Sequence, residues 1–477
     1  MMNKRSLLIL MIIFTLLLPT GAVFAQNGAP EGPVYIVQEG DTLWSIAVRF
    51  GVSVEELQTV NNLSNASHLT IGYQLIIPGL EGASGVIVTE TIPFGESLRS
   101  LSRSYQLPPE TLIKLNHLTV PSELFAGRFL TIPQQEGPVS PMKRALLSGG
   151  LSLIEISVIE GCNPWEIVFT NNLQGTWDGA TGDVLQISTL DTGISEPAGP
   201  TALPAAIRTI EISPLPFLQG KTTAIKISAE PGITFSGTFM GHDLHIYTDQ
   251  NDVYAAIQGA HAMAEPGLYP MQLNGTLADG SSFSFSQMVP LAPVDYPYDR
   301  PLTVDPTTID PAVTKPEDAQ WNQLALPATP ERLWDSIFEI PSPLPVDYCL
   351  ETGDCFSSRF GNRRSYNGGP YSSFHTGLDI VGKTGTDIYA PAPGTVVFAG
   401  PLTVRGNATM INHGWGIYTA YMHQDEILVQ VGDQVEAGQL IGKIGSTGRL
   451  EGPHLHWEVW AGGVQVDPLD WLEQAYP

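Results

Sequence analysis

We predict a multidomain chain that joins small α+β repeats, a β-sandwich-like middle domain and a mostly antiparallel β domain at the C-terminal end. Three observations lead to this fold class. The chain has 477 residues, too many for one ordinary hydrophobic core. A pattern of residues recurs at an interval of 55 positions in the first half. Short alternating apolar runs separated by turn residues fill much of the second half, which is typical of β-strands.

The N-terminal segment predicts export from the cytoplasm. Two basic residues precede an apolar run over 7–18, and Ala25 offers a small residue at the usual cleavage position. An uncleaved membrane anchor would need about 20 apolar residues, but Pro19 ends the run too early. We therefore expect a signal peptide over residues 1–25 and a mature protein that is secreted or held in the cell envelope, without stable membrane insertion.

The charge of the chain restricts its partners. It carries 22 basic and 48 acidic residues, which gives a net charge of −26. Such a chain repels polyanions, so nucleic acid and anionic lipid are not expected as partners. An uncharged or mixed-charge partner fits better.

Two of the three cysteines lie close together in the sequence. Cys349 and Cys355 bracket a short turn, and outside the cell such a pair can form a lasting disulfide. The rival interpretation, a pair of zinc-binding thiols, lacks a further ligand nearby in the sequence. Cys162 has no obvious mate.

Three copies of one unit fill residues 34–190. The letters G-D-T-L at 40–43 recur as G-E-S-L at 95–98 and as G-L-S-L at 150–153. Asn61 recurs at the same two offsets. Each unit begins with a short β-rich run, continues with two short apolar patterns of helical period and ends with a strand. The sequence therefore predicts three β-α-α-β units.

The run V-x-x-G-D-T-L-W-x-I-A, followed by N-N-L and L-I-I-P, resembles the LysM module. The resemblance is close over 34–79, good over 86–134 and degenerate over 140–190. It implies binding to the N-acetylglucosamine glycan of peptidoglycan or chitin, and several units on one chain would raise the overall affinity. The candidate glycan contacts are Gly40, Asp41, Thr42, Asn61 and Asn62. Capping of the first helix by Asp41 or Thr42 is an equally open interpretation.

The middle of the chain predicts a domain of its own. Alternating apolar runs with turn signals between them indicate an immunoglobulin-like β-sandwich over 208–293. A Pro-rich linker over 294–344 follows, with a short helix expected near Pro330 to Phe338.

Half of the ten histidines fall in the last 103 residues, a clustering that suggests a metal site. In a strand His454 and His456 share one face, so both could bind a metal, or one could bind while the other acts on its water. Asp379 follows His375 by four residues and shares its face if the segment is extended. Zinc in a hydrolase takes three nitrogen or oxygen ligands and keeps a fourth position for water.

The ordered motifs F-H-T-G-L-D-I, N-H-G-W-G-I-Y-T-A-Y-M-H and G-P-H-L-H-W-E-V resemble the lysostaphin/LytM-type zinc endopeptidases over 345–472. The resemblance implies one Zn²⁺ per chain, with His375, Asp379 and His456 as ligands. It also implies that His423 and His454 form the catalytic pair, which handles the protons while water activated by zinc attacks a peptide carbonyl. Which of the two is the base stays open, and His413 is expected to be structural.

These features together predict a secreted peptidoglycan hydrolase. Its LysM modules would hold the glycan, and its zinc endopeptidase domain would cleave peptide stems or cross-bridges; we expect a monomer. The alternative is a non-catalytic wall-binding regulator that activates a separate amidase, as zinc-less members of this family do. Such members usually lose ligands, whereas this sequence keeps all five implied site residues. A purely carbohydrate-binding envelope protein would leave those five residues without a role.

Overall fold

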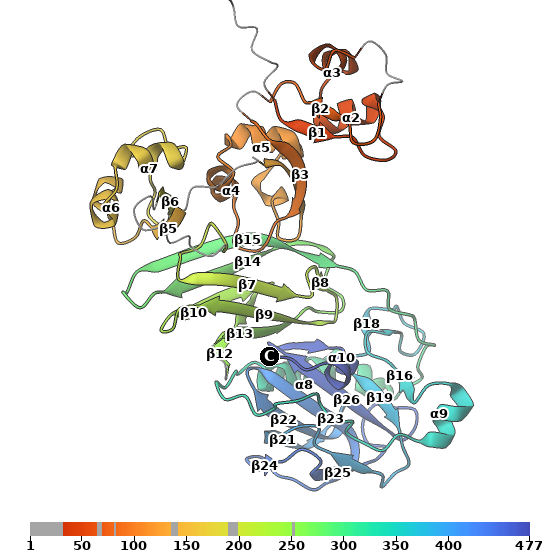
Figure 1. Ribbon diagram of the computed structural model, residues 1–477. Coiled ribbons are helices and arrows are strands. Elements are labelled where there is room, and N and C mark those ends of the chain that lie inside the picture. The colour runs from red at the N-terminus through yellow and green to blue at the C-terminus, as the bar shows by residue number, and fades with distance from the viewer. Residues whose placement is uncertain (1–31, 64–68, 81–82, 135–141, 189–198, 250–252) are drawn as a thin grey trace, which may run out of the picture. The chain divides into compact units, whose positions relative to one another are not determined.

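The structure is a computed structural model, drawn in Figure 1. The residues that it describes are 32–63, 69–80, 83–134, 142–188, 199–249 and 253–477. The expected signal peptide over residues 1–25 lies outside these ranges, so it stays a prediction. The chain divides into two compact units, the first formed by residues 1–88 and 133–136 and the second by residues 89–132 and 137–477.

The predicted order of strand, two helices and strand is confirmed in all three repeats. The first repeat consists of β1 (Val34–Ile36), α2 (Leu43–Phe50), α3 (Val54–Val60) and β2 (Gln74–Ile76). The second consists of β3 (Val86–Thr91), α4 (Leu98–Ser104), α5 (Pro109–Asn116), the 3-10 turn η2 (Pro121–Glu123) and β4 (Phe129–Gln134). The third consists of β5 (Met142–Leu146), α6 (Leu153–Glu160), α7 (Pro164–Thr170) and β6 (Val184–Ser188).

The repeated Ser or Thr at the start of each unit caps a helix. The side chains of Thr42, Ser97 and Ser152 each accept a hydrogen bond from the backbone N–H three residues further on. Asp41 does not cap; its carboxylate accepts hydrogen bonds from the Tyr35 hydroxyl and the backbone of the β1–α2 turn, both at 2.7 Å. The capping interpretation is therefore confirmed for Thr42 and wrong for Asp41.

The repeated Asn closes each unit. The Asn61 amide donates to the carbonyls of Leu57 in α3 and Ile76 in β2, and accepts from the Ile76 N–H at 2.7 Å. Asn116 and Asn171 make the same three bonds in their own units. The residue thus ties the second helix to the closing strand, which gives Asn61 a role in folding that the sequence pattern did not reveal.

The middle domain is built from two antiparallel sheets, which confirms the β-sandwich-like prediction. One sheet has the order β11-β10-β14-β15-β8, in which only β8 pairs in parallel, and the other β12-β13-β9-β7. Buried apolar residues from both sheets form one core, including Ile225, Phe239 and Val289. The strands are β7 (Ile207–Ser213), β8 (Phe217–Leu218), β9 (Thr222–Ala229), β10 (Thr234–Phe239), β11 (His242–Leu244), β12 (Tyr247–Thr248), β13 (Tyr254–Gly259), β14 (Gly267–Thr276) and β15 (Ser282–Ala292).

The C-terminal domain is organised by one large antiparallel sheet of order β16-β19-β26-β23-β22-β21-β24. This confirms the predicted mostly antiparallel β architecture. Its strands are β16 (Phe356–Ser358), β19 (Leu378–Val381), β20 (Asp387–Tyr389), β21 (Gly394–Leu402), β22 (Gly406–Gly414), β23 (Ile417–Ile427), β24 (Gln434–Val435), β25 (Leu440–Ile444), β26 (His454–Ala461) and β27 (Val464–Val466). The remaining elements are α9 (Val346–Thr352), the hairpin β17 (Arg363–Arg364) and β18 (Ser373–Phe374), and α10 (Pro468–Glu473).

The linker holds a helix, but not where the sequence suggested. The prediction of a helix near Pro330 to Phe338 is wrong, because that segment is not helical. The helix of the linker is α8 (Pro311–Leu324), which follows the 3-10 turn η3 (Pro306–Ile309). The segment 330–338 is irregular because its backbone bonds to distant parts of the chain; the N–H of Phe338, for example, donates to the carbonyl of Trp471. Proline at the first position of α8 suits a helix start.

The middle and C-terminal domains share a hydrophobic core. Ile257 of β13 belongs to the same buried cluster as Val459 of β26 and Trp471 of α10. At the edge of this contact Lys221 lies 2.8 Å from the carboxylate of Asp467. The middle domain therefore packs on the C-terminal domain through buried apolar area as well as through an ion pair.

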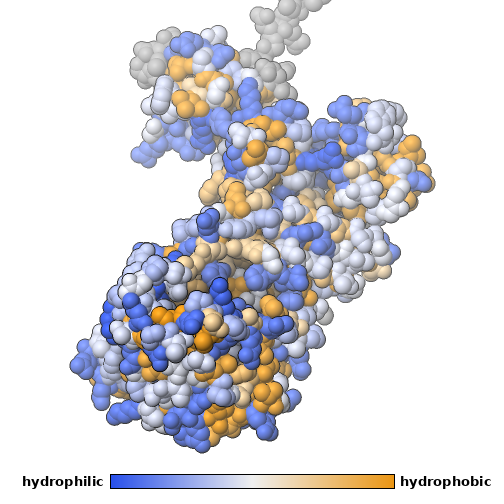
Figure 2. Space-filling view, turned by 180° about the vertical axis from the view of Figure 1, so that it is seen from behind, coloured by the Kyte–Doolittle hydropathy of each residue, from blue (hydrophilic) through white to orange (hydrophobic). Residues whose placement is uncertain are grey.

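The surface is largely hydrophilic, with hydrophobic residues in scattered patches on the face that Figure 2 shows. Among the residues that the structure describes, helices long and apolar enough to cross a membrane are absent.

We expect Ile257→Ala to destabilise the C-terminal domain although the residue lies in the middle domain. Removing a buried isoleucine side chain from a packed core costs about 2–5 kcal/mol. Calorimetry should show the unfolding transition of the C-terminal domain at a lower temperature. Leu57→Ala, at a buried position of the first compact unit, is the control and should leave that transition unchanged. An unshifted transition in Ile257→Ala would contradict the shared core.

Candidate metal centre

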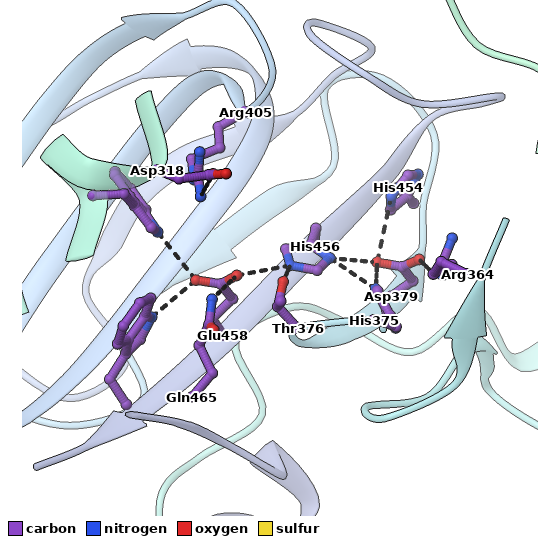
Figure 3. Close-up of polar contacts among 12 residues, drawn as sticks. Asp318, Arg364, His375, Thr376, Asp379, Arg405, His454, His456, Glu458 and Gln465 are labelled. Carbon is purple, nitrogen blue, oxygen red and sulfur yellow. Dashed lines mark hydrogen bonds and ion pairs between the residues drawn. The ribbon is translucent and has the colours of Figure 1, made fainter. Parts of the chain in front are cut away.

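Three of the predicted site residues converge at one point of the large sheet. Asp379 in β19 and His456 in β26 are direct cross-strand partners, and His375 lies just before β19. The His375 Nε2, His456 Nδ1 and Asp379 Oδ1 atoms lie 2.9 Å from one another. All three residues are buried. Figure 3 shows their side chains directed at one another.

The second nitrogen of each imidazole is engaged on the far side of the ring. His375 Nδ1 lies 2.9 Å from the Arg359 carbonyl oxygen, which can only accept, so this nitrogen carries the hydrogen. His456 Nε2 faces the Glu458 carboxylate at 3.4 Å and the Thr376 hydroxyl at 3.3 Å. These contacts direct His375 Nε2 and His456 Nδ1 at the Asp379 oxygen.

Three lone-pair-bearing atoms at such short separations repel one another unless positive charge lies among them. Two imidazole nitrogens and one carboxylate oxygen are also the donor set of many catalytic zinc sites, which leave a fourth position open. The residues present therefore fit a zinc ion. Within the described residues, this trio is the group whose His, Cys, Asp or Glu ligand atoms could hold a metal.

The pKa shifts in the cluster also favour a bound cation. Burial lowers the pKa of His375 to about 4, which keeps this imidazole neutral. Burial also acts to lower the pKa of His456, but the carboxylates of Asp379 and Glu458 outweigh it and raise that pKa to about 9. Although burial raises the pKa of Asp379, the imidazoles of His375 and His454 hold it well below its usual value. The pocket thus stabilises one positive charge, a role that a cation can take over from the proton on His456.

The two other predicted histidines border this centre. His454, two residues before His456 on β26, has Nε2 at 3.4 Å from Asp379 Oδ1 and donates from Nδ1 to the Gly452 carbonyl at 2.8 Å. His423 in β23 donates from Nδ1 to the Thr447 carbonyl at 2.8 Å, and its ring centroid lies 5.0 Å from that of His454. The structure therefore gathers all five predicted residues at one site.

His423 sits on an unusual backbone. Its φ is +62°, a left-handed conformation that residues other than glycine seldom adopt. Its N–H donates to the Arg405 carbonyl at 3.0 Å. Burial, with the charges of His454 and His456, holds the pKa of His423 well below its usual value, so the ring is neutral.

The sequence interpretation missed two residues that contact the cluster. Glu458 lies two positions after His456 on β26, so the period of two in a strand places it on the same face and could have identified it. Arg364 approaches Asp379 Oδ2 at 3.3 Å and the Asp299 carboxylate at 3.1 Å. No pattern in the sequence marks Arg364, because its neighbours come from the linker and from another strand.

The centre lies in a cleft of about 1300 Å³. Its walls come from three parts of the second unit. His261 and Met263 belong to the middle domain, Tyr298 to the linker, and Tyr366 and Arg449 to loops of the C-terminal domain. The linker and the middle domain thus contribute to the surface that a ligand would meet.

Other candidate residues lie apart from the metal centre. Cys349 and Cys355 form a disulfide, and Cys162 is a free cysteine. His413 is completely buried; its Nδ1 donates to the Pro393 carbonyl, and its Nε2 accepts from the Thr419 hydroxyl, both at 2.7 Å. Both of its nitrogens are thereby engaged in hydrogen bonds within the domain, as expected for a structural residue.

Comparison with known proteins identifies the domains. Residues 373–468 match peptidase family M23, and residues 35–78 and 91–133 match the LysM domain. The chain is 42% identical over 95 residues to the DD-carboxypeptidase/endopeptidase Mpg of Neisseria meningitidis serogroup B, which covers 20% of this chain and 22% of that protein. It is 38% identical over 112 residues to the peptidoglycan DD-endopeptidase ShyC of Vibrio cholerae, which covers 24% of this chain and 26% of that protein.

A solved structure is similar to part of the chain. The antimicrobial peptidase lysostaphin from Staphylococcus simulans is 36% identical, with a TM-score of 0.21, over 22% of this chain and 46% of the lysostaphin chain. This chain spans about a quarter of the length of the two curated relatives.

We expect the burial of His413 to make the stability of the C-terminal domain depend on pH. Burial lowers the pKa of His413 from 6.5 to about 4, so between these values the unfolded chain binds a proton that the folded chain does not. The free energy of unfolding should therefore fall as the pH decreases from about 6.5 to about 4, by up to about 3 kcal/mol from this residue. Denaturant titrations of the wild type and His413→Asn should show a shallower decrease in the variant; parallel curves would contradict this prediction.

Proposed function

We propose that this chain, which carries a peptidase family M23 domain and two LysM domains, is a zinc-dependent endopeptidase that cleaves peptide cross-links of peptidoglycan. The observation that carries the proposal is the convergence of His375 Nε2, Asp379 Oδ1 and His456 Nδ1 inside a large cleft. Two relatives of this domain, both from Vibrio cholerae, are named peptidoglycan DD-endopeptidases, which suggests the bond between D-amino acids as the one that is cut.

These three residues would hold one zinc ion per chain. When bound, zinc acts as a Lewis acid that polarises a carbonyl group and lowers the pKa of water. The orientation of the rings suits this role, because His375 Nε2 is unprotonated and His456 Nδ1 faces the same point, where zinc would replace the proton on His456. Arg364 at the outer oxygen of Asp379 keeps that carboxylate oriented and ionised.

His423 and His454 would handle the protons. Each ring donates from Nδ1 to a backbone carbonyl, so Nε2 is the atom that can accept a proton from the attacking water or return it to the departing amine. The two rings lie on one side of the centre, on the neighbouring strands β23 and β26. Their fixed carbonyl partners keep Nε2 aimed at the site without reorganisation during the reaction.

The LysM domains bind peptidoglycan, and we propose that they hold the enzyme on the glycan of an insoluble polymer. The proposed contacts are the loop groups of Gly40, Asp41, Thr42, Asn61 and Asn62, of which Thr42 and Asn61 also serve the fold. Tethering raises the local concentration of peptide substrate around the cleft. Such a protein works in the cell envelope outside the cytoplasm, and the site is complete within one chain, which suits a monomer.

The alternative, a non-catalytic regulator that activates a separate amidase, is less well supported. It needs neither a metal site nor paired imidazoles beside it. In this chain all five residues are present and assembled, and the second nitrogen of each of the four imidazoles faces an acceptor. Such a buried arrangement of polar groups is costly to the fold, and that cost favours an enzyme.

Metal removal and loss of a ligand should both abolish cleavage. Purified peptidoglycan should release fragments with new amine ends when treated with the wild type, and mass spectrometry of those ends would identify the bond. A chelator, His375→Ala or His456→Ala should each lower the rate by at least about a thousandfold, because the charge that stabilises the transition state is lost. Equal release of fragments in all samples would eliminate the enzyme hypothesis.

Removal of the first LysM module should separate binding from catalysis. That module belongs to the first compact unit, so its deletion over residues 32–80 leaves the second unit intact. We expect sedimentation with intact cell walls to weaken by about tenfold or more. Hydrolysis of a soluble cross-linked muropeptide should keep its rate, and a rate that falls equally on both substrates would speak against a tethering role.

A further inference from the structure

We propose that helix α8 of the linker is a positioning element of the metal centre and acts through Trp321 and Glu458. The inference rests on the proposed zinc site and extends it beyond residues 373–468, the part that matches peptidase family M23. Figure 3 shows the path, which runs from the helix to Glu458 and from Glu458 to His456.

The Glu458 carboxylate is enclosed by donors. It is 1% exposed, and its Oε2 accepts hydrogen bonds from the indole N–H groups of Trp321 at 3.1 Å and Trp460 at 2.9 Å. Its Oε1 accepts from the Gln465 amide at 3.1 Å and faces His456 Nε2 at 3.4 Å. A buried carboxylate is costly unless its oxygens are satisfied in this way. The arrangement therefore fixes Glu458 in one orientation.

That orientation determines which nitrogen of His456 faces the metal centre. A carboxylate beside Nε2 keeps a hydrogen there, so Nδ1, which faces Asp379 and His375, is the nitrogen left to bind a metal. Carboxylates behind ligating histidines fix the tautomer and raise the basicity of the ligand. Glu458 and Trp321 are thus positioning residues that act through His456 and do not touch the substrate.

Helix α8 also supports the side of the centre where His423 lies. The Glu317 carboxylate accepts from the backbone N–H groups of Val404 and Arg405 and from the Arg405 guanidinium, at about 3 Å. The Arg405 carbonyl in turn accepts the N–H of His423, whose φ is +62°. Helix α8 therefore supports both β26, which carries His456, and the strained backbone of His423, the proposed proton-transfer residue.

Zinc affinity tests the role of Trp321 and Glu458. In the full-length protein, competition with a chromophoric chelator gives the Kd for zinc, while circular dichroism confirms folding. Glu458→Gln places an NH₂ group among donors, and we expect its Kd to rise about 10- to 100-fold. Trp321→Phe removes one donor, and its Kd should rise about three- to tenfold. Gln465→Leu, at a half-buried position, removes another donor of Glu458. Its Kd should rise by a similar factor, and it serves as the second variant if Trp321→Phe does not fold.

A matched control separates positioning from general stability. Trp471 is also a buried tryptophan whose indole donates one hydrogen bond, to Thr222 at 3.0 Å, but it lies away from the centre. Trp471→Phe should lose stability and retain the wild-type Kd for zinc. The inference is overturned if Trp321→Phe and Glu458→Gln bind zinc as tightly as the wild type, or if Trp471→Phe weakens zinc binding equally. If the wild type itself binds no zinc, the proposed function fails instead.

Discussion

The register of one strand pair holds the centre together. β19 and β26 pair so that Asp379 lies directly opposite His456 and Val381 opposite His454. Because side chains alternate between the two faces of a sheet, a slip of one residue would turn His456 away from Asp379 and bury its ring among apolar side chains. Apolar residues between the site residues, such as Leu455 and Ile380, are completely buried on the other face, so the hydrophobic core enforces the register that the chemistry needs.

The centre also requires that each imidazole has a hydrogen-bond acceptor at the ring nitrogen that faces away from the site. Backbone carbonyls serve His375, His423 and His454, while Glu458 serves His456. These acceptors are set by the chain path and not by rotatable side chains, except at His456. That ring alone depends on a side chain with further donors around it, which explains why the linker helix reaches into this part of the domain.

Sequence patterns predicted the local features well and the long-range ones poorly. The 55-residue repeat and the alternation in the strands identified three β-α-α-β units, two β domains and the five clustered residues, because period and spacing are visible in one stretch of chain. The linker shows the limit of such reasoning. Its irregular segment near Phe338 bonds to α10, and Trp321 donates a hydrogen bond to Glu458, 137 positions further along the chain, so neither contact follows from local propensity. Glu458 could have been found from its place in the strand, whereas Arg364 could not.

The core that Ile257 shares with Val459 and Trp471 limits how this chain can be recombined. A segment excised at residues 373–468, the boundaries of the family match, would lose the apolar partner surface supplied by β13, and its own side chains there would face water. Chimeras that exchange the M23 domain should therefore keep it together with β13, because a junction that separates the two would create an adhesive surface prone to aggregation.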